Sequence, residues 1–158
     1  MEPNKAVEKI RELPFFSRLS DEELEFISHR IEFELFEPGE IIFEEHSEGN
    51  KFYVIMQGKV RISKSVNDRP KTLAILNKND YFGEIALIDK SPRSATAAAI
   101  EPVTALSITD DAFLKLMEED GKSAAKILRE LLLGFCKRMR NTNEHLKDLL
   151  AWTIANQQ

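Results

Sequence analysis

The residues best suited to chemistry lie in the stretch FGEIALIDKSPRSATAAA, residues 82–99. Gly83 precedes the carboxylate of Glu84, and Arg93 follows nine positions after that carboxylate, directly behind a proline. A glycine at the start of a short helix lets a ligand approach exposed backbone N–H groups, which together with the helix dipole bind anions. The planar guanidinium of Arg93 is able to hold two phosphate oxygens at once. This spacing therefore indicates a phosphate site.

Glu84 carries the wrong charge for a phosphate, so within the same cavity it must accept hydrogen bonds from hydroxyl groups. A phosphate joined to a sugar satisfies both side chains. Ser94 is able to add a hydroxyl to the phosphate or the base, and room for the ligand would come from the small residues Ala86, Ala95 and Ala97. The alternative that the residues leave open is a plain ion pair between Glu84 and Arg93.

Three zones of different residue pattern follow one another, and no linker or low-complexity tract separates them, which predicts a single domain over residues 1–158. In the first zone, residues 1–31, one helix ends at Pro14. A capping box, SDEE, begins the second helix. One face of this second helix is predicted to carry Leu24, Ile27 and Ile31.

The middle zone, residues 32–108, alternates runs of branched and aromatic residues with turns about every ten positions. The turn signals are PG, EGN, QG, NDRP and NKND. This spacing predicts an antiparallel sandwich, barrel or jelly roll. Alternation is clearest at Val60 and Ile62, and the opposite face carries Lys59, Arg61 and Ser63.

The third zone, residues 109–158, is predicted to be helical, with a cap at Thr109 and a break at Gly121. A long helix from Ser123 to about Ala155 carries a coiled-coil seam, with alternating spacings of four and three, at Leu128, Leu132, Phe135, Met139, Thr142, Leu146, Leu149 and Thr153. Such a helix, roughly 50 Å long, exceeds what a roll of this size covers. We therefore expect a homodimer through Leu128, Leu132, Phe135, Met139, Leu146 and Leu149; the alternative is a seam that packs along its own roll.

Composition limits the classes of function. A net charge of -5 argues against a general nucleic-acid surface, and no apolar run approaches the roughly 18 residues of a membrane span. The charged N-terminus lacks a signal-peptide core, and one cysteine cannot form an internal disulfide, so a cytoplasmic protein is expected. A rival, a metalloenzyme on a β-roll, would need clustered ligands. The only histidines lie in three different zones, at His29, His46 and His145, so we expect neither an enzyme nor a metal or cofactor.

The stretch 82–99 resembles the phosphate-binding cassette of the cyclic nucleotide-binding domain family, which includes catabolite activator proteins and the regulatory subunits of cyclic-AMP-dependent kinase. The matching residues are Phe82, Gly83, Glu84, Ala86, Leu87, Pro92, Arg93, Ala95, Thr96 and Ala99. The resemblance extends over nearly the whole chain. It implies an α+β, mainly β fold: an eight-stranded antiparallel β-roll, or jelly roll, with N-terminal helices and a long C-terminal helix.

Residue roles follow from the resemblance. Glu84 would accept the ribose 2′-hydroxyl, and Arg93 would neutralise the cyclic phosphate with Ser94 adjacent. Backbone amides would surround the same phosphate at Gly83, Glu84, Ile85 and Ala86. Phe82 and Ala95 complete the cassette.

Thr142 and Asn143 are similar to the helix segment that contacts the purine in catabolite activator proteins. Thr142 is also the polar residue well inside the apolar seam, where it either contacts the base or is a tolerated hydroxyl that fixes the register. The candidates for the floor of the base pocket are Val60, Ile62 and Leu73, which core packing explains equally well.

Two positions depart from the family pattern. Asn79 stands where a glycine is usual, and asparagine tolerates the left-handed backbone that such a turn needs. Ser94 replaces the alanine or threonine often associated with cyclic AMP or cyclic GMP, so both ligands stay open, and Thr142 and Asn143 favour cyclic AMP. We expect a stand-alone sensor that signals through its C-terminal helix to a separate effector protein, without contacting nucleic acid or a membrane. The alternative is an interaction module with a remnant cassette.

Overall fold

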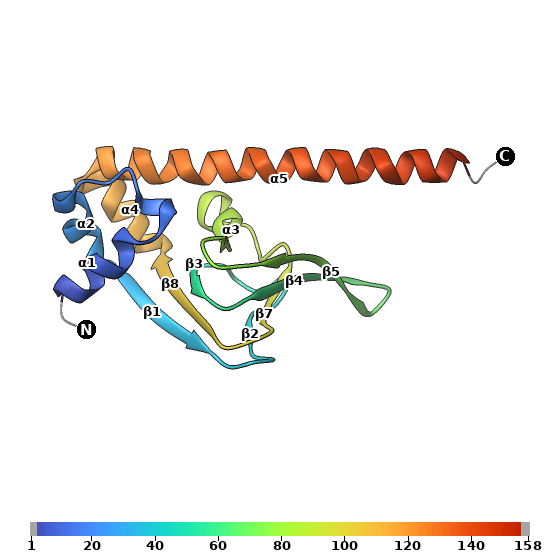
Figure 1. The fold of residues 1–158 in the computed structure, drawn as a ribbon, viewed down its shortest axis with the longest axis horizontal. Helices are drawn as coiled ribbons and strands as arrows, with labels where there is room; N and C mark the ends of the chain where they lie inside the picture. The colour runs from blue at the N-terminus through green and yellow to red at the C-terminus, as the bar shows by residue number, and fades with distance from the viewer. Residues whose placement is uncertain (1–2, 156–158) are drawn as a thin grey trace.

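The computed structural model describes residues 3–155, apart from the side chains of residues 3–5, 86 and 87 (Figure 1). Its helices are α1 (Pro3–Arg11), the 3-10 helix η1 (Pro14–Phe16), α2 (Asp21–Ser28), α3 (Glu84–Asp89), α4 (Asp110–Glu119) and α5 (Gly121–Ala155). Its strands are β1 (Ile31–Phe36), β2 (Ile41–Phe43), β3 (Lys51–Gln57), β4 (Val60–Val66), β5 (Arg69–Leu76), β6 (Tyr81–Phe82), β7 (Thr96–Ala99) and β8 (Val103–Thr109).

The strands form two four-stranded antiparallel sheets, in the orders β1-β8-β3-β6 and β2-β7-β4-β5. The N-terminal helices and α4 gather at one end, and α5 runs across the roll (Figure 1). This confirms the predicted fold of an eight-stranded β-roll with N-terminal helices and a long C-terminal helix. No helix among residues 3–155 is both long and apolar enough to cross a membrane.

Two of the predicted turns, NDRP and NKND, contain residues with left-handed backbone. Asn67 and Asp68, with φ of 52° and 58°, join β4 to β5 through the pair of positive φ values that a tight hairpin prefers. Asn79 has a φ of 74°, so the left-handed turn expected before the cassette is present.

Strand β3 is buried on both faces because it separates two apolar clusters. Phe52 and Val54 face a cluster formed with the N-terminal helices, α4 and the start of α5. Tyr53 and Ile55 face the interior of the roll. The alternation of β3 side chains therefore joins the helical layer to the roll, and it fixes the position of β6, which pairs with β3 through Tyr53 and Val54.

One sequence expectation was wrong in detail. Ile31 does not extend the face of α2, because that helix ends at Ser28 and Ile31 pairs with Ile108 of β8 instead. Strand β4 pairs with β7 in regular register from Val60 to Ser63, so Ser63 keeps the face of Arg61 that the alternation predicted, although Ser63 is buried and Arg61 is exposed. The register shift between β4 and β5 falls at Leu73 of β5, which the pairing skips.

The predicted helix caps are present. Ser20 and Glu23 form the reciprocal capping box of α2, and Thr109 accepts a hydrogen bond from the backbone N–H of Ala112 at 3.1 Å. The break between the last two helices falls at Asp120, immediately before Gly121.

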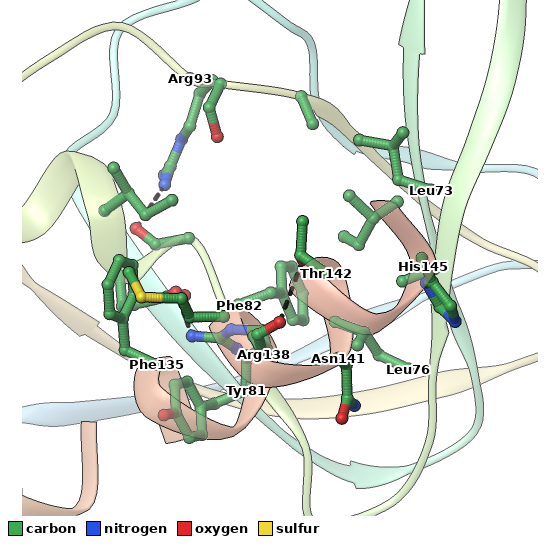
Figure 2. A pocket seen from close by; sticks show the side chains of 18 of the residues that line it. Leu73, Leu76, Tyr81, Phe82, Arg93, Phe135, Arg138, Asn141, Thr142 and His145 are labelled. Atoms are coloured by element: carbon green, nitrogen blue, oxygen red, sulfur yellow. Dashed lines mark hydrogen bonds and ion pairs between the residues drawn. The ribbon is translucent and has the colours of Figure 1, made fainter. Parts of the chain in front are cut away.

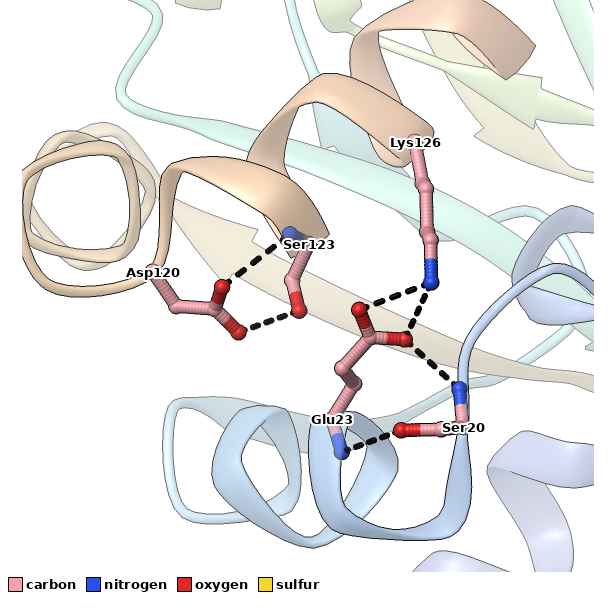
Figure 3. Close-up of polar contacts among 5 residues, drawn as sticks. All are labelled: Ser20, Glu23, Asp120, Ser123 and Lys126. Carbon is pink, nitrogen blue, oxygen red and sulfur yellow. Dashed lines mark hydrogen bonds and ion pairs between the residues drawn. The ribbon is translucent and has the colours of Figure 1, made fainter.

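The capping box of α2 also joins this helix to α5 (Figure 3). Lys126 of α5 donates to both oxygens of Glu23, at 2.7 and 2.6 Å. Asp120 accepts from the backbone N–H of Ser123 at 3.2 Å and from its hydroxyl, which satisfies donors in the first turn of α5. These contacts anchor the start of α5, and α5 then passes over the cavity described below.

Candidate functional site

A cavity of about 590 Å³ lies between the β-roll and α5 (Figure 2), a volume typical of small-molecule sites. Arg93 reaches toward it from one side, and Thr142 points into it from α5. Eleven of the predicted site residues line it: Ile62, Leu73, Phe82, Gly83, Glu84, Ile85, Arg93, Ser94, Ala95, Thr142 and Asn143. Residues far apart in the sequence therefore meet at one cavity.

Two predicted residues stand apart from this set. Val60 is fully buried in the interior of the roll and is not part of the cavity lining. Its neighbour two positions on, Ile62, is only partly buried and does line the cavity. Ala86 belongs to α3, but its side chain lies outside the described residues.

The backbone and side chain of Arg93 are both fixed. Its N–H donates to the carbonyl of Ser47 and its carbonyl accepts from the N–H of His46, both at 2.8 Å. The guanidinium donates through Nη1 to the carbonyl of Gly83 at 2.9 Å and through Nη2 to the carbonyl of Lys51 at 2.7 Å. The carbon Cζ lies 4.0 Å from the ring centroid of Phe43, a cation–π arrangement. Arg93 is thus held in place without a carboxylate.

Arg93 is a buried cation without an ion-pair partner in the described part of the chain. The residue is 4% exposed, and within residues 3–155 no carboxylate forms an ion pair with it. Its buried Nε has no hydrogen-bond partner among the described residues. Burial lowers the pKa of Arg93, and the nearby Tyr53 and Glu84 offset this effect only in part. An anion in the adjacent cavity would compensate this charge.

Gly83 is required by the approach of this guanidinium. Its φ is 80°, and a Cβ at this position would lie 2.7 Å from Nη1 of Arg93 and 3.1 Å from the carbonyl oxygen of Lys51. Both the left-handed backbone and the close contact exclude larger residues. The glycine noted in the sequence therefore brings the start of α3 against Arg93.

Glu84 is paired with α5, and not with Arg93. The residue is 7% exposed, and its Oε1 accepts a hydrogen bond from Nη2 of Arg138. Burial raises the pKa of Glu84, and the positive charge of Arg138 opposes that rise. The plain Glu84–Arg93 ion pair, left open by the sequence, is not the arrangement in the structure.

Arg138 also lines the cavity, and the sequence analysis did not include it among the candidate site residues. Besides its contact with Glu84, it donates to the carbonyl of Tyr81 at 3.2 Å and lies 4.7 Å above the ring centroid of Tyr81. A signal was available, since Arg138 lies one turn before Thr142 and therefore shares its face of the helix.

The predicted seam of α5 divides into parts with different surroundings. Leu128 packs against the helical core, whereas Phe135, Met139 and Thr142 line the cavity. The hydroxyl of Thr142 donates to the carbonyl of Arg138 at 3.0 Å. Phe135 and Met139 nevertheless stay exposed by 43% and 53%, and Leu146 and Leu149 farther along α5 are exposed as well. Most of the seam is therefore not buried by its own roll.

Comparison with known proteins gives one family. The model described as "Cyclic nucleotide-binding domain" matches residues 33–120. A relative from Mycobacterium tuberculosis, described as a CRP-like cAMP-activated global transcriptional regulator, is 34% identical over 73% of this chain and 50% of its own length. The cGMP-dependent protein kinase, isozyme 1, of Drosophila melanogaster is 33% identical over 71% of this chain and 15% of its own length. The chain thus spans half or less of these relatives.

A solved structure has the same fold as this chain. A cyclic nucleotide-binding domain from Methylobacillus flagellatus superposes with a TM-score of 0.79, covers 90% of this chain and 81% of its own, and is 23% identical. At this identity the likeness concerns the fold alone.

Proposed function

The chain belongs to the cyclic nucleotide-binding domain family, and from this premise we propose that it is a cyclic nucleotide sensor whose ligand occupies the cavity between the roll and α5. The proposal is supported above all by the surroundings of Arg93. This buried cation lies at the cavity, its Nε–H has no hydrogen-bond partner among the described residues, and none of their carboxylates forms an ion pair with it. A cyclic phosphate supplies the missing negative charge and the missing hydrogen-bond acceptor.

The phosphate would bind where the start of α3 meets Arg93. The first backbone N–H groups of a helix have no acceptor within the helix, so Gly83, Glu84, Ile85 and Ala86 offer donors there. Ser94 is exposed at the same end of the cavity and adds a hydroxyl. Phe82 and Ala95 complete the wall.

The sugar would bind at Glu84. Arg138 occupies Oε1 of this carboxylate, and an ionised carboxylate has several further acceptor positions for the ribose 2′-hydroxyl. Since the carboxylate is buried, a sugar without that hydroxyl would leave acceptors unsatisfied.

The base would lie between Ile62 and Leu73 of the roll and Thr142 and Asn143 of α5. The proton of the Thr142 hydroxyl is already donated to the carbonyl of Arg138, so its oxygen offers lone pairs to a ligand. The exocyclic amine of adenine is a donor, whereas guanine presents a carbonyl oxygen at that position. This complementarity favours cyclic AMP over cyclic GMP.

The signal would pass to α5, because this helix supplies one wall of the cavity and contacts Glu84 through Arg138. We propose that the chain is a single domain and a cytoplasmic homodimer joined by the exposed seam of α5, and that a separate effector protein senses the change in α5. We expect α5 to contact neither nucleic acid nor a membrane directly.

Calorimetric titration with cyclic AMP and cyclic GMP tests the proposal, since one relative is described as cAMP-activated and another as cGMP-dependent. Micromolar or tighter binding of one nucleotide is expected. Arg93→Ala should weaken it by roughly 100-fold or more, because the phosphate loses its buried partner. Arg61→Ala is the matched control, since Arg61 is exposed on β4 and is not part of the cavity lining.

A titration without binding heat would have two explanations, an already occupied site or a site that does not bind nucleotide, and a second measurement distinguishes them. The protein is denatured and the supernatant is analysed for released nucleotide. Released cyclic nucleotide shows that the site was already filled and supports the proposal. A flat titration without released nucleotide favours the alternative, an interaction module whose cassette is a remnant.

A further inference from the structure

Gly134 lies in the interior of α5, where glycine costs stability relative to alanine. The helix continues without a break from Gly121 to Ala155. Neither a turn nor a helix end explains this glycine, and nothing in the proposed binding site uses it directly. The contact of Gly134 with Tyr81 explains why a glycine is needed here.

The ring of Tyr81 occupies the place where a side chain at position 134 would be. A Cβ there would lie 1.7 Å from the Tyr81 hydroxyl oxygen and 2.6 Å from Cζ. In an α-helix each side chain covers the turn before its own Cα, so glycine at 134 leaves the carbonyls of the preceding turn open. The hydroxyl of Tyr81 donates to the carbonyl of Leu131 at 2.8 Å and lies 3.3 Å from that of Glu130.

Tyr81 is buried between the sheet and the helical core. It pairs with Val54 across the sheet, is 9% exposed, and its ring contacts that of Phe15 with centroids 5.2 Å apart. Because contacts with the sheet and the helical core hold Tyr81 in place, the position of its ring determines how closely α5 packs against β6.

Positions 134, 138 and 142 follow one another at spacings of four, so they share one face of α5. Arg138 contacts Glu84, and Thr142 points into the cavity (Figure 2). The location of Gly134 against Tyr81 therefore determines where both side chains lie over the site.

We propose that Tyr81 and Gly134 position α5 over the ligand cavity, so that both are positioning residues for nucleotide binding; as far as it concerns binding, this rests on the function proposed above. Any side chain at 134 pushes α5 away from β6 and moves Arg138 and Thr142 off the ligand.

The test is Gly134→Ala, with Gly121→Ala as the matched control in the same helix, because a Cβ at 121 meets no atom within 4 Å. Gly134→Ala should lower the melting temperature and weaken cyclic AMP binding by at least about tenfold, measured well below both melting temperatures. Gly121→Ala should change neither by much. Helix propensity alone predicts the opposite for position 134, so a more stable Gly134→Ala with unchanged affinity overturns the proposal.

A double-mutant cycle isolates the contact. In a Tyr81→Leu background the ring atoms that collide with a Cβ at 134 are gone, so Gly134→Ala should cost much less there than in the wild type. Equal costs in the two backgrounds would show that the contact is not the cause. Should Gly134→Ala not fold, Tyr81→Phe provides a milder variant: it should speed amide hydrogen exchange in residues 131–155, and an unchanged exchange rate refutes the positioning role.

Hydrogen exchange also keeps the two proposals separable, since it needs no ligand. If the wild type binds neither nucleotide, the proposed function fails, yet faster exchange of α5 in Gly134→Ala than in Gly121→Ala still supports the Tyr81–Gly134 contact. Equal exchange in the two variants overturns the contact whether or not a nucleotide binds.

Discussion

Two buried charges at the cavity are stabilised in different ways. Glu84 has a cationic partner on α5, whereas Arg93 has two carbonyl partners and a ring. Carbonyls orient a guanidinium without neutralising it, so the positive charge remains available to a ligand. The pairing of Glu84 with Arg138 would link a ligand bound at Glu84 to α5.

The role of Glu84 predicts discrimination between sugars. 2′-Deoxy cyclic AMP should bind at least about tenfold more weakly than cyclic AMP, because the buried carboxylate would lose a hydrogen bond without gaining water. Competition of the two nucleotides against a fluorescent cyclic AMP analogue measures the ratio. Equal affinities would remove Glu84 from the binding site.

The environment of Glu84 also predicts a pH dependence of stability. Burial raises its pKa above the ordinary value of 4.5, so between 4.5 and the raised pKa the folded protein binds more protons than the unfolded chain. The contribution of Glu84 to the free energy of unfolding should therefore increase as pH falls through that window. Urea unfolding of wild type and Glu84→Gln measures it: the difference between them should shift in favour of wild type on acidification, and a shift the other way contradicts the assignment.

At the scale of elements, the start of α5 depends on α2 through Lys126 and Glu23 (Figure 3). The hydrogen bond from Lys126 lowers the pKa of Glu23, opposite in sign to Glu84. This stabilisation is therefore present above pH 4.5, the ordinary value for Glu23, and is lost as pH falls through its lowered pKa.

Removing this partner should have a small, pH-dependent effect. Lys126→Met is expected to lower the free energy of unfolding at pH 7 by less than about 1 kcal/mol, because the pair is partly exposed. Below pH 4.5 the variant should lose less stability than the wild type on further acidification. Lys122→Met, an exposed position one turn earlier, is the control. Parallel pH profiles for Lys126→Met and wild type would show that the pair contributes nothing.

At the scale of the whole molecule, α5 extends past the β4–β5 hairpin in the view of Figure 1. Its distal part carries exposed apolar side chains, with Leu146 and Leu149 exposed by 52% and 62% and Leu150 and Ile154 by 55% and 64%. A contiguous apolar surface of this kind is typical of an interaction site. The seam spacing makes a second copy of the chain the favoured partner.

Light scattering at micromolar concentration should give a dimer for the wild type. Leu146→Glu and Leu149→Glu should each shift it toward the monomer, because a charge would be buried in the seam. Ala151→Glu introduces the same charge on the face of α5 away from the seam and should leave the dimer intact. A monomeric wild type, with and without nucleotide, would contradict the proposed dimer.

The sequence by itself determined the features that depend on consecutive residues. The capping box at Ser20, the cap at Thr109 and the turns at Asn67 and Asn79 follow from local hydrogen bonds and backbone preferences. The cassette was predictable because Gly83, Glu84 and Arg93 lie within one short stretch.

The tertiary structure decided what depends on distant segments. Arg138 and Glu84 are 54 positions apart, and their pairing depends on where α5 crosses the roll. Depth in the roll separated buried Val60 from Ile62, which lines the cavity. The need for glycine at position 134 likewise depends on Tyr81, whose ring lies where a side chain at 134 would be. Local energies encode turns and caps, whereas these contacts exist only once packing has fixed the position of α5.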